Sequence, residues 1–488
     1  MKTYPTIETL RQLKSEGEYN IAPVCMEILS DFTTPIETMR VLKNVSSHCY
    51  MLESATANER WGRYSFLGYN PKMEITCTDG NIFVDNVPVQ AKSPSEYIRK
   101  VLMEYRSPKF ENLPSFTGGF VGYFSYDYIR YAEPILKKTT TSKDDFKDVD
   151  LMLFDKVIAF DNVRQKIILI VNVKLAYLET EYNRAVTELK DMARLITKGE
   201  KKREEKGKLL GEVKPLFDMK TFCEMVEKVK HYIFEGDIFQ VVLSNRMCAP
   251  FEGSLFSTYR VLRTINPSPY MFYFQGTDVE FAGASPETLV KLEDGVLRTF
   301  PLAGTRKRGK TEEEDKKLEE ELLVDEKELA EHNMLVDLGR NDLGKISKFG
   351  TVVVEKLHEI ERFSHVMHIG STVRGEIKEE KDALDAIEAV LPAGTLSGAP
   401  KIRACQIIDE LENNKRGIYG GAIGYIDFTG NMDTCIAIRL VYKKGKTVFV
   451  RSGAGIVADS DPNKEFEECM NKARATLEAL KIDTEEEL

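Results

Sequence analysis

Short strand signals and amphipathic helices alternate along this chain without the strict strand–helix–strand rhythm of a parallel sheet. Strands are predicted at 73–77 and 82–84, one turn apart, and at 151–160 and 166–173 as a second hairpin. Tight hairpins join antiparallel strands, whereas parallel strands need a long crossover. The order of elements therefore predicts an α+β fold built on antiparallel sheets.

Two glycine-rich strand sequences echo each other far apart in the chain. GGFVGY occupies 118–123 and GGAIGY occupies 420–425. Glycine inside a strand marks a close backbone approach or a bulge, and the match is compatible with two related half-sheets. The segment 198–213 is highly charged, lacks aromatic residues and is the best linker candidate. We therefore divide the chain into residues 1–213 and 214–488.

Composition narrows the class of protein. With 488 residues, 42% hydrophobic and 30% charged, the chain is typical of a globular protein of two to four domains or one large fused architecture. A net charge of −10 argues against a general nucleic-acid binder. No apolar run approaches the length of a membrane span, and the eight cysteines form no Cys-x-x-Cys pair. We expect a cytoplasmic protein without nucleic-acid or membrane partners.

The stretch 451–472 combines an anion pocket with the start of a helix. Residues 452–455 are Ser-Gly-Ala-Gly, small enough for a ligand to approach the backbone closely. Asp461 and Pro462 follow, an N-cap residue and a proline at the first helical position. The pattern predicts a backbone-rich anion pocket that leads into a helix and suits a ligand carrying carboxylates.

Two pairs of glutamates share a three-residue spacing. Glu465 and Glu468 lie on the predicted terminal helix, and Glu328 and Glu331 lie on a helix far upstream. Residues three apart project from one helix face, so two such helices could close on one hard cation. The alternative, favoured by spacing alone, is that both pairs are solvated helix faces.

Residues 304–311, GTRKRGKT, satisfy the phosphate-binding pattern G-x-x-x-x-G-K-[ST]. The preceding strand contains Pro301 and lacks the apolar run of a buried parallel strand. Four acidic residues, 312–315, follow at the point where a helix N-terminus would have to attract phosphate. We interpret the pattern as a chance match and keep a P-loop nucleotide-binding protein as the alternative from another class.

Long sequence motifs carry a family resemblance over nearly the whole chain. They are NPSPYMFY (266–273), GASPETL (283–289), PLAGTRKRG (301–309), EHNMLVDLGRNDLG (331–344), HVMHIGSTVRG (365–375), LPAGTLSGAPKIRA (391–404), YGGAIGYI (419–426), CIAIRL (435–440), RSGAGIVADSDP (451–462) and EFEECMNKA (465–473). With them the chain resembles the chorismate-utilising enzymes, most closely the large subunits of anthranilate synthases. The resemblance implies a two-layer antiparallel β-sheet core flanked by helices, with a regulatory half (1–213) packed on a chorismate-binding catalytic half (214–488).

The resemblance also implies the reaction: chorismate and ammonia give anthranilate and pyruvate, the first step of tryptophan biosynthesis. Ammonia would come from glutamine through a separate amidotransferase subunit. Mg²⁺ would be bound directly by Glu331 and Glu468 and through water by Glu328 and Glu465, an all-oxygen set. The substrate positions implied are Thr395, Tyr419, Arg439, Gly453, Ala454, Gly455 and Lys472.

The catalytic positions implied are Glu287, His368, Ala303 and Thr305. Glu287 is the candidate acid for the departing 4-hydroxyl, and its small apolar neighbours could raise its pKa by burial; Ser-Pro-Glu is also a plausible helix start. His368 is the candidate base for aromatisation. His332 and His365 are expected to be structural. Related enzymes that add water or stop at the aminodeoxy product tend to carry lysine at position 303, so Ala303 favours full conversion to anthranilate.

The resemblance places a tryptophan inhibitor site at Glu53, Ser54, Pro269, Tyr270 and Met271, where the two halves would meet. Two further alternatives stay open. One is aminodeoxychorismate synthase component I, which position 303 disfavours. The other is a tryptophan-binding regulatory protein without catalysis, disfavoured because each matched catalytic position holds the expected residue type.

Overall fold

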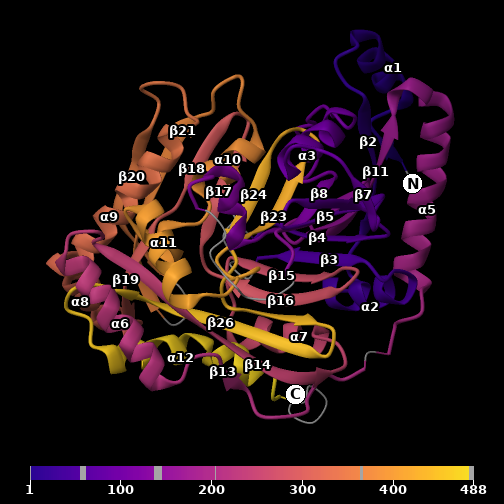
Figure 1. The fold of residues 1–488 in the computed structure, drawn as a ribbon. Coiled ribbons are helices and arrows are strands. Elements are labelled where there is room, and N and C mark those ends of the chain that lie inside the picture. The colour runs from indigo at the N-terminus through magenta and orange to yellow at the C-terminus, as the bar shows by residue number, and fades with distance from the viewer. Residues whose placement is uncertain (1, 55–61, 137–145, 204, 363–365, 483–488) are drawn as a thin grey trace.

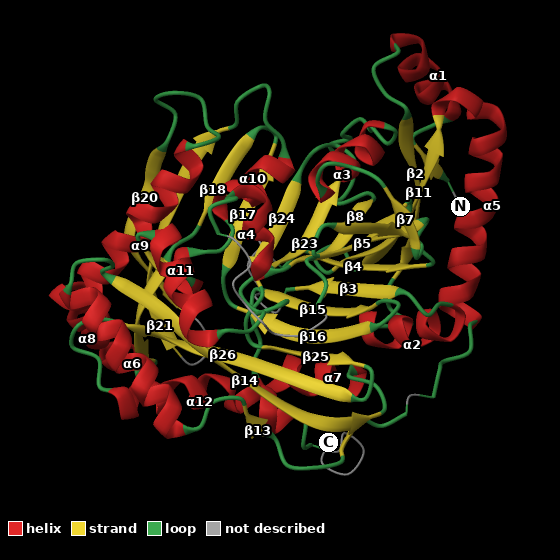
Figure 2. Ribbon diagram, viewed as in Figure 1, coloured by secondary structure: helices red, strands yellow, loops and turns green. Residues whose placement is uncertain are grey.

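The computed structural model describes residues 2–54, 62–136, 146–203, 205–362 and 366–482. Two large antiparallel sheets pack face to face and helices cover their outer sides (Figures 1 and 2). This confirms the α+β fold with a two-layer antiparallel core. No helix in these ranges is long and apolar enough to cross a membrane.

The first sheet runs in the order β1 (Thr3–Tyr4), β2 (Ile21–Leu29), β11 (Lys166–Lys174), β10 (Lys156–Asp161), β4 (Tyr64–Tyr69), β3 (Cys49–Glu53), β15 (Tyr270–Gln275), β16 (Val279–Ser285), β25 (Leu440–Lys444), β26 (Thr447–Ile456), β14 (Gln240–Glu252) and β12 (Lys208–Leu209), with β13 (Lys214–Pro215) and β22 (Gly398–Ala399) also on β14. The second sheet runs in the order β19 (Leu302–Lys307), β21 (Val366–Glu376), β18 (Val296–Thr299), β17 (Thr288–Glu293), β24 (Met432–Ile436), β23 (Ala422–Asp427), β8 (Gly119–Phe124), β9 (Val149–Phe154), β5 (Met73–Thr78), β6 (Asn81–Val84) and β7 (Val87–Val89), with β20 (Val353–Arg362) on β21.

The helices are α1 (Ile7–Glu16), α2 (Pro35–Val45), α3 (Pro94–Met103), α4 (Ile129–Ala132), α5 (Leu178–Lys198), α6 (Met219–Phe234), α7 (Phe256–Ile265), α8 (Glu312–Leu323), α9 (Glu326–Gly344), α10 (Ala383–Val390), α11 (Lys401–Glu412) and α12 (Pro462–Ala479). Asp461 caps α12 with Pro462 at its first turn, as predicted. The sequence predicts one helix over 312–337, but the structure has two, α8 and α9, because Asp325 caps a new helix by accepting from the Glu328 amide.

The two halves of the chain repeat one topology. In the first sheet β3 pairs with β15, and in the second β8 pairs with β23, so the centre of each sheet joins one half to the other (Figure 1). Outward from these pairs, β4, β10, β11 and β2 correspond in order to β16, β25, β26 and β14. The two similar glycine-rich sequences are therefore neighbours in the structure, and Gly122 lies opposite Gly424 in register. Both sheets continue across the sequence division at residue 213.

In each half two short passages lead directly from a long strand of one sheet to a long strand of the other. The passages lie at 70–72 and at Asp155 in the first half, and at 286–287 and 437–439 in the second. The sequence predicts 151–160 and 433–442 as single strands, because an apolar run does not show which sheet each part joins. The structure divides both runs, and the dividing residues include Arg439, whose φ is +50°.

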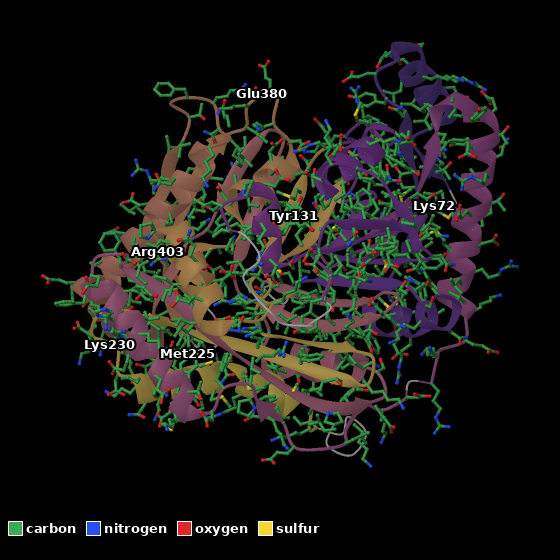
Figure 3. All side chains as sticks on the ribbon, in the orientation of Figure 1. Lys72, Tyr131, Met225, Lys230, Glu380 and Arg403 are labelled. Atoms are coloured by element: carbon green, nitrogen blue, oxygen red, sulfur yellow. The ribbon has the colours of Figure 1, made fainter. Side chains whose placement is uncertain are left out.

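Aromatic side chains fill the space between the sheets. The ring centroids of Tyr50 on β3 and Phe154 on β9 are 4.7 Å apart, and those of Tyr123 on β8 and Phe281 on β16 are 5.8 Å apart. All four side chains are buried, and Figure 3 shows how densely side chains occupy this layer. Edge-to-face rings bury a large apolar area, which holds the two sheets in one rigid frame.

Candidate active site

Glu287 lies in the passage between β16 and β17, where the chain leaves the first sheet for the second. Pro286 and Glu287 connect two strands there, so the helix start considered from the sequence is wrong. Burial raises the pKa of Glu287 to about 7, against the opposing effects of Thr395, Arg439 and Lys472. A carboxyl with this pKa keeps a substantial protonated fraction near neutral pH, about half at pH 7, and can donate a proton.

Thr395 and Arg439 stand beside this carboxyl. The Thr395 hydroxyl donates to Glu287 Oε1 at 3.2 Å from the short helix Gly394–Leu396. Arg439 lies in the second passage, between β24 and β25, in the left-handed region at φ +50°. Its carbonyl accepts from the Ala284 amide at 3.1 Å, which ties the two passages together. Such strain in a non-glycine residue persists only where the surrounding structure enforces it.

The small residues of β26 form the next wall. A Cβ atom at Gly453 would lie 2.6 Å from the Leu243 carbonyl oxygen and 2.9 Å from the Tyr419 hydroxyl, and one at Gly455 would lie 2.6 Å from Gln240 Nε2. These positions share one face of the strand, so only glycine lets the backbone lie against Tyr419 and Gln240. The side chain of Ala454 points the other way, into a buried apolar cluster.

The stretch that matches the phosphate-binding pattern is a β-bulge. β19 pairs antiparallel with β21, and the register shifts between Ala303 and Arg306, with Gly304 at φ +65°. The amides at 309, 310 and 314, where the next helix begins, donate to Asp315, Glu314 and Thr311. Because this strand is antiparallel and these donors are bonded within the segment, it is not a P-loop.

The bulge instead orients His368 on β21. The His368 Nδ1–H donates to the Gly304 carbonyl at 2.8 Å, and the Thr305 hydroxyl lies 3.1 Å from the same nitrogen. This hydrogen bond makes Nε2 the basic nitrogen of the neutral ring. Burial lowers the pKa of His368, so the ring is neutral at physiological pH. Ala303 is buried opposite Ile369 at the start of the bulge.

The four glutamates lie on α9 and α12 and interact across the space between these helices. Burial and then the Glu328 charge raise the pKa of Glu331, and Lys472 of α12 opposes this. Burial raises the pKa of Glu465 too, with Glu468 adding to it and Lys327 of α9 opposing it. The Lys472 ammonium is 2.7 Å from Glu468 Oε1 in a half-exposed ion pair, so it lies on the carboxylate face as the spacing predicts.

Among the described residues no three histidine, cysteine or acidic side chains converge tightly enough to hold a metal ion as they stand. The donor chemistry nevertheless fits a hard cation, because all four side chains offer oxygen. Gln240, which bonds Glu331, adds a buried side-chain oxygen without a hydrogen-bond partner in the described structure. Its sequence, GDIFQ, carries no motif signal, so sequence reasoning missed it.

His332 follows Glu331 on α9 and is fully buried. Its Nε2 lies 2.6 Å from the Ser371 hydroxyl, and burial lowers its pKa to about 4. It therefore stays neutral and packs α9 against β21, the structural role expected. His365 lies outside the described residues.

A cavity of about 220 Å³ lies where β3 meets β15. It is lined by all five residues assigned to the inhibitor: Glu53, Ser54, Pro269, Tyr270 and Met271. Asp433, Cys435 and Tyr425 also line it and were missed, because they belong to strands of the catalytic half that sequence patterns do not place nearby.

Glu53 is already paired in this cavity. Its carboxylate accepts from the Tyr259 hydroxyl at 2.6 Å and from Arg263 Nε at 2.9 Å. An α-ammonium group that binds Glu53 must therefore compete with Arg263. On the opposite wall the Tyr270 hydroxyl donates to Asp433 at 2.8 Å and lies 3.0 Å from the Thr288 hydroxyl, one residue from Glu287.

Residues 47–478 match the family model described as chorismate binding enzyme. The chain is 46% identical to a protein from Acetivibrio thermocellus named anthranilate synthase component 1, and 45% identical to a protein of the same name from Aquifex aeolicus; each alignment covers 98% of both chains. The crystal structure of anthranilate synthase component I from Streptococcus pneumoniae is similar with a TM-score of 0.74, at 37% identity over 92% of this chain and 98% of that one.

The menaquinone-specific isochorismate synthase MenF from Escherichia coli shares the fold, with a TM-score of 0.69 at 19% identity over 97% of this chain and 98% of that one. The family match spans both sequence halves and every site residue named above. The chain belongs to the family of chorismate-binding enzymes.

Proposed function

We propose that the chain is the chorismate-converting large subunit of an anthranilate synthase. One observation carries this: Glu287, a carboxyl with a pKa of about 7, lies beside a half-buried arginine and a glycine-rich strand. The relatives that match the chain over nearly its whole length are named anthranilate synthase component 1. Chorismate has two carboxylates and a hydroxyl that must leave. The site offers an anion cradle and a protonated acid for these groups.

The cradle would hold the enolpyruvyl carboxylate with Arg439, the Tyr419 hydroxyl and the backbone amides of 453–455. An arginine fork and strand amides are suited to a carboxylate. The protonated Glu287 would donate its proton to the departing 4-hydroxyl. The hydrogen bond from the Thr395 hydroxyl would hold the Glu287 carboxyl in position. Ammonia adds at the ring carbon left open to attack, in the space that Ala303 leaves free.

His368 would then accept the ring proton through Nε2 as pyruvate is eliminated and the ring becomes aromatic. Its neutral state and its fixed tautomer suit it to the role of base. Glu331 and Glu468, with Glu328 and Glu465 acting through water, would hold Mg²⁺, which as a Lewis acid polarises the ring carboxylate. Lys472 would balance the charge on Glu468.

We further propose that tryptophan inhibits the enzyme from the 220 Å³ cavity. The cavity joins the two halves of the chain, so an occupant contacts both. The relatives' name, component 1, implies a partner component, and we propose a glutamine amidotransferase that supplies ammonia. None of the eight cysteines, all of which lie in the described ranges, forms a disulfide; this fits a reducing compartment, and we propose the cytoplasm.

Anthranilate fluorescence tests the reaction. We expect the purified chain, mixed with chorismate and ammonium at mildly alkaline pH, to produce fluorescence that requires Mg²⁺ and is suppressed by tryptophan. Chorismate consumption without fluorescence would favour aminodeoxychorismate synthase instead. Absence of consumption would contradict the proposal.

A further inference from the structure

Directly behind the carboxylate cradle lies a triad of charged side chains that the reaction does not use. Glu412 ends α11, Arg416 follows it, and Arg451 lies on β26, two residues before Gly453. The side chains of all three are at most 1% exposed. Arg403 marks the start of the same helix in Figure 3.

The triad is fully bonded. Glu412 Oε2 accepts from Arg416 Nε at 3.0 Å and from Arg451 Nη2 at 2.7 Å, and Oε1 accepts from Arg416 Nη2 at 2.5 Å. Burial alone would raise the pKa of Glu412, but the two arginines lower it, so the carboxylate stays ionised. Two cations and one anion leave one positive charge in excess beneath the cradle.

Arg416 also contacts the segments that form or support the cradle. Arg416 Nη1 donates to the Leu396 carbonyl at 2.6 Å, next to Thr395, and Nη2 donates to the Val242 carbonyl at 2.7 Å, opposite Gly455 in register. The Arg416 guanidinium also lies 6.0 Å from the ring centroid of Tyr419.

Ser244 connects the triad to the strand itself. It lies opposite Gly453 in register, and both its amide and its hydroxyl donate to Glu412 Oε1, at 2.8 and 2.9 Å. Its hydroxyl also accepts from Arg451 Nε at 2.8 Å. The triad therefore touches the turn that carries Thr395, the strand behind 453–455 and the ring of Tyr419.

A buried ion cluster with no ligand contact contributes little to stability relative to apolar packing. This one combines an excess of charge of the sign that attracts a carboxylate with hydrogen bonds to two parts of the carboxylate site and a ring contact with a third, Tyr419. We propose that Arg416, supported by Glu412 and Arg451, is a positioning residue that preorganises the cradle for the substrate carboxylate and biases it electrostatically toward an anion. The inference rests on the cradle assigned under the proposed function.

The test compares Arg416→Lys with Lys415→Met. Lysine keeps the charge at 416 but cannot reproduce the planar fork. Lys415 is the neighbouring buried cation, but its ammonium pairs with Asp79 at 2.9 Å and with Asp148 at 3.4 Å, on the first half of the chain. Both variants remove a buried ionic contact, and only the first loosens the cradle.

We expect Arg416→Lys to raise the chorismate KM, and the chorismate Kd measured calorimetrically without ammonia, about tenfold. The KM for ammonia should stay within about twofold, because ammonia carries no carboxylate for the cradle to bind. Lys415→Met should lower Tm without changing the affinity for chorismate. If Arg416→Lys does not fold, Ser244→Ala removes one small link and should raise the chorismate Kd about threefold.

Tyr419→Phe, measured in parallel, separates the two levels of the argument. If it weakens chorismate binding while Arg416→Lys and Ser244→Ala do not, the cradle stands and the positioning role is wrong. If none of the three affects chorismate affinity, the cradle itself is misplaced. Equal effects of Arg416→Lys and Lys415→Met on chorismate affinity would reduce the triad to a purely structural role.

Discussion

Single residues in this site are placed where their ordinary chemistry is altered by burial, and Glu287 is the clearest case. The sequence predicts the direction of its pKa shift from small apolar neighbours, and the structure raises that pKa to about 7. Sequence could not show its partners, because Thr395 and Arg439 approach it from segments more than 100 residues away.

Glu287→Gln should lower kcat by about two to four orders of magnitude, since it removes a general acid without changing shape. In the unmodified enzyme, kcat/KM at constant free ammonia should fall as pH rises through about 7, because only the protonated carboxyl donates. Initial-rate fluorescence across pH measures both. A variant that retains activity would exclude Glu287 as the acid.

Burial of the Glu287 carboxyl should also lower the free energy of unfolding at neutral and alkaline pH. The folded protein holds the Glu287 proton more tightly than the unfolded chain, with a pKa of about 7 against 4.5. The contribution of this group is therefore greatest below pH 4.5 and is lost as pH rises to about 7. Glu287→Gln should be more stable than the parent by up to about 3 kcal/mol at pH 8, and nearly equal to it at about pH 4, below the pKa of the unfolded chain. Urea unfolding at the two pH values tests this, and equal stabilities at pH 8 would contradict it.

A substitution at position 303 tests which product the site releases. Ala303→Lys places a long amine in a buried position opposite Ile369, and we expect anthranilate formation to fall about tenfold or more through overpacking and a competing base. Chromatography of the products distinguishes slower turnover from accumulation of a hydroxy or aminodeoxy compound. Unchanged activity would show that position 303 does not select the product.

At the scale of elements, the second half departs from the topology of the first in one insertion. β19, α8, α9 and β20 lie between β18 and β21, and this insertion carries Ala303, Thr305, Glu328 and Glu331. The first half has only a short connection between β6 and β7 in the corresponding place. The shared frame carries Glu287, His368 and the carboxylate cradle, and the insertion adds the bulge that orients His368 and one of the two glutamate pairs.

The glutamate pairs on α9 and α12 predict a response to metal. Mg²⁺ should raise Tm by about 1–3 °C when in large excess over its Kd, because it binds only the folded arrangement. Glu331→Gln and Glu468→Gln should abolish this rise, whereas Glu467→Gln, an exposed glutamate on the same helix, should retain it. Scanning fluorimetry with and without chelator measures the shift. An unchanged response in all three variants would place the metal elsewhere.

Much of the element order could be predicted from hydrophobic periodicity and capping residues, including the start of α12 at Asp461 and Pro462. Three features could not. The runs divided at Asp155 and Arg439 are apolar on both sides of the dividing residue, and the edge strand β20 carries charged residues on an exposed face. The triad of Glu412, Arg416 and Arg451 is assembled by tertiary packing and leaves no local pattern.

At the scale of the whole molecule, the cavity proposed for tryptophan lies where β3 of the first half pairs with β15 of the second. Ser54→Arg should fill part of it and weaken inhibition by tryptophan about ten- to hundredfold, with the rate in the absence of tryptophan as reference. Ser47→Arg, on an exposed position of the same half, is the control. Undiminished inhibition in Ser54→Arg would show that tryptophan binds elsewhere.

The repeated topology also gives the active site a counterpart in the other half. The passage that carries Glu287 corresponds to the one at Lys72, and the passage that carries Arg439 corresponds to the one at Asp155. Lys72, which is labelled in Figure 3, and Asp155 form an ion pair at 3.1 Å. At these two positions the signs of the charges are reversed relative to Glu287 and Arg439. The two side chains neutralise each other, so neither is available to bind a substrate. Opposite charges thus neutralise each other at one crossing between the sheets, whereas at the equivalent crossing Glu287 and Arg439 lie beside the proposed substrate cradle.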